Sequence, residues 1–193
     1  MKPESFAEAL AQLVHCYFPS GLRNDDPRYR ESEEGQRLTR LLQANEQPSS
    51  TWKGFTRRVV EAFPDCNVWD TTVPMHEPCN SVRVSLPGSM PGGSRYDCVV
   101  GLLSQLAPVY AIYASHTDKS RPEGDYWLRF PPFPPEFQAH EARLAGLIES
   151  TLGLTRLSND TLFTPVPELV PRSANYGLGE AQLIDCLFTW HRW

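Results

Sequence analysis

A cysteine, a histidine and an aspartate in the middle of the chain are the residue types of a nucleophilic hydrolase. They are Cys98, His116 and Asp118. A thiol needs a nearby base to become a thiolate and a carboxylate to orient that base. Cys98 lies in an apolar run that predicts a strand, where a cysteine is usually a small core side chain. A thiol-dependent hydrolase is therefore one alternative, and it requires the fold to bring these side chains together.

A second set of residue types could bind a metal ion. Cys66, Asp70, His76 and Cys79 are all competent ligands. Their spacing is irregular and no second ligand pair repeats it, as structural zinc sites usually do. The sequence also lacks the common glycine-rich, zinc-protease and serine-hydrolase motifs. A metal-dependent hydrolase remains an alternative, but we expect no metal and no cofactor.

Composition and charge indicate a folded, mildly acidic protein. The chain has 193 residues, of which 40% are hydrophobic, and a net charge of −5. Residues 1–64 carry nine basic and nine acidic side chains, and residues 65–193 carry nine and fourteen, so the whole excess lies in the second part. Nucleic-acid binding usually needs a basic surface. We therefore expect no direct contact with nucleic acid, whereas a basic protein would be attracted.

The start of the chain and its cysteines favour a cytoplasmic protein. The first residues, with Glu4 and then Glu8, make a poor signal peptide. The five cysteines have no disulfide-framework spacing. The apolar segment 96–114 is about long enough to cross a bilayer, but it contains Asp97 and Pro108. Two buried strands joined by a turn explain this segment better, so we expect no membrane contact.

The first third of the chain predicts helices. Phe6, Leu10, Val14 and Tyr17 recur at helical spacing, and residues 22–31 read as a surface loop. Further helices are expected around residues 38–42 and after Ser49, with Pro64 ending the last one. Residues 1–64 are therefore expected to be mainly helical.

Residues 80–190 predict a sheet-rich part. Residues 82–86 alternate as a half-exposed strand, and segments 98–103, 109–114 and 126–130 predict three more. A long helix is expected from about Glu136, and residues 181–188 are expected to form a final strand. Short connections favour antiparallel neighbours. The sequence thus predicts a single α+β domain over residues 1–193, with N-terminal helices, an antiparallel sheet of four to six strands and one long helix in the C-terminal half.

Several segments of the second part, taken in order, resemble a group of small bacterial proteins. They are Tyr110-Ala111-Ile112-Tyr113, Tyr126-Trp127-Leu128-Arg129-Phe130, Pro135-Glu136, Val166-Pro167-Glu168 and Gly179 to Phe188. The group is similar to the immunity proteins of polymorphic toxin systems, and the resemblance covers roughly residues 80–190. It implies a helix-plus-sheet fold, no catalysis of its own and a cognate protein toxin as partner. The excess of acidic residues would suit a toxin that is a basic nuclease.

The partner-binding residues expected for such an inhibitor are acids and aromatic anchors. The acids lie in the polar stretch from Ser115 to Asp125, and the anchors are three tryptophans. The set is Asp118, Glu123, Asp125, Trp127, Trp190 and Trp193. The bland alternative is that the acids only solvate a loop and the tryptophans are partly buried. A generic interaction or adaptor module is the other function that the same features allow.

Overall fold

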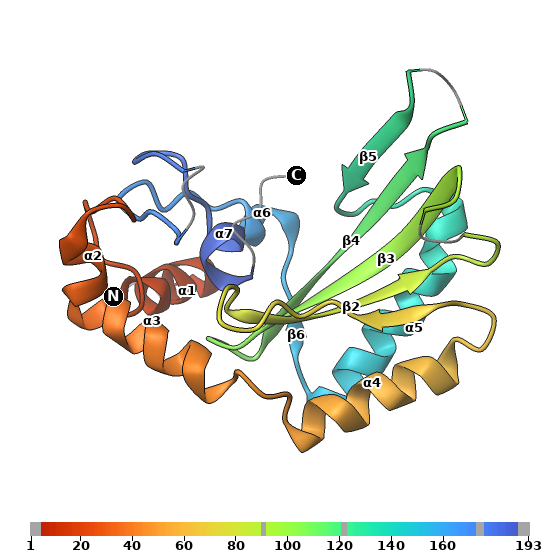
Figure 1. The fold of residues 1–193 in the computed structure, drawn as a ribbon, viewed down its shortest axis with the longest axis horizontal. Coiled ribbons are helices and arrows are strands. Elements are labelled where there is room, and N and C mark those ends of the chain that lie inside the picture. The colour runs from red at the N-terminus through yellow and green to blue at the C-terminus, as the bar shows by residue number, and fades with distance from the viewer. Residues whose placement is uncertain (1–4, 90–91, 121–122, 173–175, 189–193) are drawn as a thin grey trace.

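The computed structural model describes residues 5–89, 92–120, 123–172 and 176–188. It confirms a mixed α+β fold (Figure 1). A sheet runs through the middle, and helices pack on both of its faces. The helices are α1 (Phe6–His15), α2 (Pro27–Glu31), α3 (Glu33–Ala44), α4 (Ser50–Ala62), α5 (Pro135–Leu152), α6 (Asn159–Leu162) and α7 (Leu183–Leu187).

The sheet has the order β1-β2-β3-β4-β5 with antiparallel neighbours. Its strands are β1 (Val68–Asp70), β2 (Cys79–Ser85), β3 (Arg95–Ser104), β4 (Val109–Asp118) and β5 (Asp125–Arg129). A two-residue strand, β6 (Thr155–Arg156), pairs in parallel with the start of β4. The outer parts of β4 and β5 form a hairpin that reaches beyond the helices, and we call residues 115–129 the arm (Figure 1).

Successive residues of β3 and β4 point to opposite faces of the sheet, and each face is buried under different helices. Val99, Leu103 and Ile112 pack with α4 and α5 in one cluster. Val100, Leu102 and their neighbours on the other face pack with α1, α3 and α7 in a second cluster. The first 64 residues therefore serve both faces, because α4 lies on the opposite side of the sheet from α1 and α3.

Local sequence signals explain where the helices begin. Ser5, Ser32 and Ser49 each accept a hydrogen bond from a backbone N–H in the first turn of the helix that follows. This satisfies donors that a helix start otherwise leaves free. At the C-terminal end of α5, Gly153 takes a left-handed conformation with φ of 66°, which suits glycine. The predicted helices of the first third and the long helix are confirmed.

Three expectations about individual elements are wrong. The predicted strand 181–188 is instead one bridge between Pro165 and Gln182 followed by the short helix α7 (Leu183–Leu187). All five residues of α7 are buried, so their hydrophobicity has no period that distinguishes a helix from a strand. Part of the predicted loop 22–31 is the helix α2, which begins at Pro27 behind the Asp26 cap. The β2 strand is not half-exposed, because Arg83 is partly covered and Ser85 fully buried.

In the described part of the chain, no helix is both long and apolar enough to cross a membrane.

Candidate functional site

The structure does not bring the predicted thiol hydrolase residues together. Cys98 lies opposite Ser115 in the β3–β4 register, and its Sγ is 3.0 Å from the serine Oγ. His116 is the next residue along β4, so its side chain points to the other face of the sheet. Burial raises the pKa of the Cys98 thiol, which favours the unreactive protonated form. His116 and Asp118 were expected in a polar loop, but they belong to β4.

The predicted metal ligands are also apart. Within residues 5–89, 92–120, 123–172 and 176–188, no group of three histidine, cysteine, aspartate or glutamate side chains could hold an ion. Cys79 is fully buried against the cluster of α1, α3 and α7. Asp70 accepts a hydrogen bond of 2.7 Å from Trp52 Nε1, and Cys66 lines a separate cavity.

A buried carboxylate organises the base of the arm. The side chain of Asp97 is only 5% exposed, and its two oxygens contact His116 Nδ1 and, at 2.7 Å, Arg95 Nε. The other imidazole nitrogen of His116 lies 3.7 Å from Asp125. Asp97 was not among the functional residues predicted from the sequence. The signal was a single carboxylate inside an apolar strand, because a buried charge requires partners.

Aromatic packing fixes Trp127 beside this cluster. Its ring stacks on His116 with centroids 5.3 Å apart and meets Phe137 of α5 edge-on at 5.2 Å. The guanidinium of Arg129 lies 4.9 Å from the ring centroid. Trp127 therefore ties β5 to α5, and as a partner-binding anchor it stays a prediction.

The three predicted acids lie at the end of the arm. Asp118 and Asp125 are directly opposite each other in the β4–β5 register, and Glu123 is exposed between them. The segment 118–125 also contains Lys119 and Arg121, so its net charge is −1. Like charges that face each other across two strands destabilise a hairpin. Trp190 and Trp193 lie outside the described residues.

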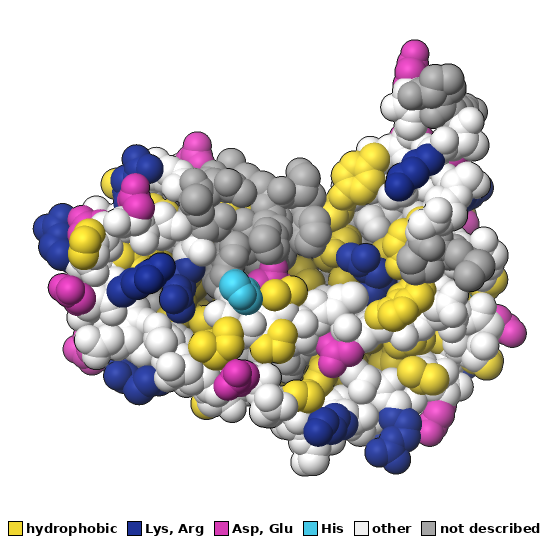
Figure 2. All heavy atoms as spheres, in the orientation of Figure 1, with side chains coloured by type: hydrophobic (Ala, Val, Ile, Leu, Met, Phe, Trp, Pro, Cys, Tyr) yellow, Lys and Arg dark blue, Asp and Glu magenta, His cyan; other side chains and the backbone are white. Residues whose placement is uncertain are grey.

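The face of the sheet that points away from α5 is rich in aromatic side chains, and it continues onto the arm. Tyr126 is 59% exposed, the largest value among the described large hydrophobic residues, and Phe163 is 38% exposed. Phe163 meets the ring of Phe130 edge-on at 5.3 Å. We call this surface the aromatic face, and it consists of Trp69, Tyr96, Tyr126, Leu128, Phe130 and Phe163. Figure 2 shows hydrophobic side chains gathered beside the arm, over the strands that face the viewer in Figure 1.

Arg83 lies on the same side of the sheet as the aromatic face. Its charge is close to the phenol groups of Tyr96 and Tyr113, and its Nε is buried without a hydrogen-bond partner among the described residues. Opposing causes act on the pKa of Arg83. Burial is the largest single cause, and it lowers the pKa. The neighbouring thiol and phenols raise it, and their sum leaves the pKa above its ordinary value. A partly buried permanent cation thus lies close to the phenols of Tyr96 and Tyr113.

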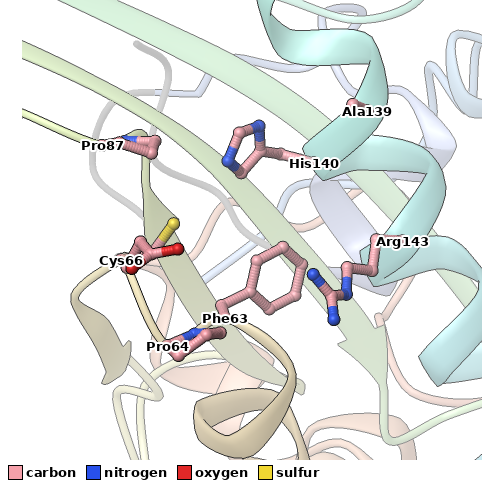
Figure 3. Close-up of a pocket in the computed structure, with 8 residues that line it drawn as sticks. Phe63, Pro64, Cys66, Pro87, Ala139, His140 and Arg143 are labelled. Carbon is pink, nitrogen blue, oxygen red and sulfur yellow. The ribbon is translucent and has the colours of Figure 1, made fainter.

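A cavity of about 130 Å³ opens between the end of α4 and the first half of α5 (Figure 3). Phe63, Cys66 and Pro87 line one side, and Ala139, His140 and Arg143 of α5 line the other. Sequence analysis did not find it, because its two sides are about 75 residues apart in the chain.

Comparisons of the chain with protein-family models, with curated proteins and with solved structures gave no match.

Proposed function

We propose that the protein is a cytoplasmic immunity protein, which binds a cognate bacterial toxin and neutralises it by occlusion, without catalysis of its own. The aromatic face of the sheet, which continues onto the projecting arm, carries this proposal. Aromatic residues are enriched in the cores of protein interfaces and supply most binding hot spots. Tyr126 and Phe163 are exposed and Trp69, Tyr96 and Phe130 are half-buried, so rings held on one side of the sheet offer a partner apolar area at little entropic cost.

The distribution of charge supports a protein partner with a basic surface. The acids Asp118, Glu123 and Asp125 surround the end of the arm, while the excess of acidic residues lies in the second part of the chain. Opposite charges at the rim of an interface accelerate association more than they increase affinity. The resemblance to immunity proteins covers residues 80–190, the part that contains the arm.

Growth rescue tests the proposal directly. The protein is expressed together with the toxin-like domain encoded by a neighbouring gene, and we expect growth to be restored and the two proteins to co-purify in equal amounts. A Tyr126→Ala variant should rescue less well at the same expression level. Failure to restore growth against every adjacent toxin domain would contradict the proposal.

A generic interaction or adaptor module is the second candidate, because the aromatic face would suit any partner with an apolar surface. Stable co-purification with a non-toxic partner through Tyr126, together with no growth rescue, would favour it. The hydrolase alternatives have no support from the geometry, since the described residues do not bring Cys98 and His116 to one face.

A further inference from the structure

The cavity between α4 and α5 has a mainly apolar wall, to which Phe63 contributes. Phe63 is 3% exposed, and its ring is nearly parallel to the imidazole of His140 with centroids 6.0 Å apart. The volume of about 130 Å³ is close to that of the engineered cavity of about 150 Å³ that binds benzene. A six-membered ring or a branched aliphatic group therefore fits against this wall.

The polar groups inside the cavity are neutral. Burial, reinforced by the charge of Arg143, lowers the pKa of His140, so its imidazole is uncharged at neutral pH. Burial, with the charge of Asp65 as the next cause, raises the pKa of the Cys66 thiol. The labelled residues in Figure 3 show the thiol and the imidazole on facing sides of the space beside Phe63. The interior thus suits an uncharged group.

Two opposite charges lie at the rim. Arg143 extends from α5, and its guanidinium is 5.3 Å from the centroid of the Phe63 ring. Asp65 follows α4 on the other side of the opening. Both residues are exposed, and no ion pair or hydrogen bond joins either side-chain charge to another described residue. A guanidinium binds carboxylates well, and a carboxylate binds an ammonium.

We propose that this cavity binds a free α-amino acid with a benzene-sized side chain, of the phenylalanine class. The side chain lies against Phe63 and His140, the carboxylate meets Arg143 and the ammonium meets Asp65. The two rim charges select this class, because a free amino acid carries both ionic groups on the carbon next to its side chain. A residue within a peptide chain has lost both charges. This inference goes beyond toxin binding and does not depend on it.

The test is a titration of the full-length protein with L-phenylalanine, followed by amide chemical shifts. We expect saturable shifts at Phe63, Asp65 and Cys66 and at residues 139–143. L-phenylalaninamide lacks the carboxylate and N-acetyl-L-phenylalanine lacks the ammonium, so each should bind about tenfold more weakly. Glycine, which has no side chain to fill the cavity, should cause no saturable shift there.

Variants of the cavity provide the second part of the test. Arg143→Gln should weaken L-phenylalanine about tenfold and leave the affinity for L-phenylalaninamide unchanged. Asp65→Asn should likewise weaken L-phenylalanine about tenfold and leave the affinity for N-acetyl-L-phenylalanine unchanged. Ala139→Leu places a larger side chain at the opening of the cavity. Leucine is also a good helix former, so the variant should block binding without unfolding the protein. Arg40→Gln and Glu46→Gln remove charges from the distant α3 region and serve as controls.

The proposal is overturned if wild-type protein shows no saturable shifts at the cavity. It is also overturned if N-acetyl-L-phenylalanine or L-phenylalaninamide binds as tightly as the amino acid, or if Ala139→Leu binds normally. The titration contains no toxin, so a negative result leaves the proposed function standing, and failed growth rescue leaves this inference standing.

Discussion

The carboxylate of Asp97 holds the imidazole of His116 across the β3–β4 pair, where the two residues lie directly opposite each other. Asp97 also accepts a hydrogen bond from Arg95, and its backbone N–H donates to Ser89 Oγ. The side chain of Asp97 therefore joins β3 to β4, and its backbone joins β3 to the loop between β2 and β3. The base of the arm is fixed by this residue more than by the charges at its end.

Replacing Asp97 with asparagine should lower the free energy of unfolding by about 2 kcal/mol. The variant keeps the shape of the side chain but replaces the carboxylate that contacts Arg95 and His116 with a neutral amide. The matched control is Asp125→Asn, because Asp125 is 60% exposed and lies 3.7 Å from the same histidine. It should cost at most about 0.5 kcal/mol. Urea unfolding measures both, and equal losses would contradict the central role of Asp97.

Removing the ring of Tyr126 should weaken binding to the partner about tenfold or more, since a central interface aromatic commonly contributes about 2 kcal/mol. Stability should be almost unchanged, because the side chain is largely exposed. Phe6→Ala is the control, as Phe6 is 53% exposed on α1, away from the arm. Calorimetry with the purified partner gives both affinities. An unaffected Tyr126→Ala variant would show that the partner binds elsewhere.

Neutralising the acids of the arm should slow association. In the triple variant Asp118→Asn, Glu123→Gln and Asp125→Asn, the rate constant for association should fall about threefold at low salt, with little change in dissociation. The effect is small because Lys119 and Arg121 already offset two of the three charges. A control triple variant removes three exposed acids of the first 64 residues, Glu31, Glu46 and Glu61. Stopped-flow binding at several salt concentrations distinguishes them, and an equal effect of both would mean that only net charge matters.

Alkaline pH should destabilise the fold through its buried tyrosines. Burial raises the pKa of Tyr29 and Tyr113 in the folded protein. Their protonated forms therefore stabilise the fold fully below the ordinary tyrosine pKa of about 10, and this stability is lost as the pH rises above that value. Unfolding midpoints between pH 8 and about pH 11 should fall, and less steeply for Tyr113→Phe. Complete phenolate formation near pH 10 in protein that is still folded would refute this expectation.

A glycine in the central strand allows α5 to approach the sheet. A Cβ added to Gly101 would lie 3.3 Å from Ile148 Cδ1 and 3.5 Å from Leu144 Cδ2. Those atoms are flexible side-chain ends, so Gly101→Ala should change stability by less than about 1 kcal/mol. Gly101→Val should cost about 2 kcal/mol, because the second branch has no space. Urea unfolding of the pair decides this, and a valine variant as stable as wild type would contradict the close packing.

The strongly periodic segments could be predicted from the sequence. The helix beginning at Phe6, the helix after Ser49 and the long helix from Pro135 all combine a cap or an N-terminal proline with an apolar stripe. The order of the central strands followed from alternation and short turns. The opposite placement of Tyr126 and Trp127 on β5 followed from the twofold period of a strand.

The remaining features depend on tertiary contacts. The run Leu183–Leu187 is buried throughout, so its residues carry no period that separates a helical turn from a strand. The strands β1 and β6 have three and two residues, too few to produce a pattern. His116 lies in β4 because that strand continues for ten residues, paired with β3 and β5, beyond its apolar part.

The pairing of β4 also decides how a load on the arm would be carried. This strand pairs with β3 along almost its whole length, with β5 near its end and with β6 at its start. Tension applied at the end of the arm would load the long β3–β4 ladder in shear, so its hydrogen bonds would have to fail together. The hairpin should therefore resist deformation, and a partner bound to it would transmit force into the sheet that α5 packs against.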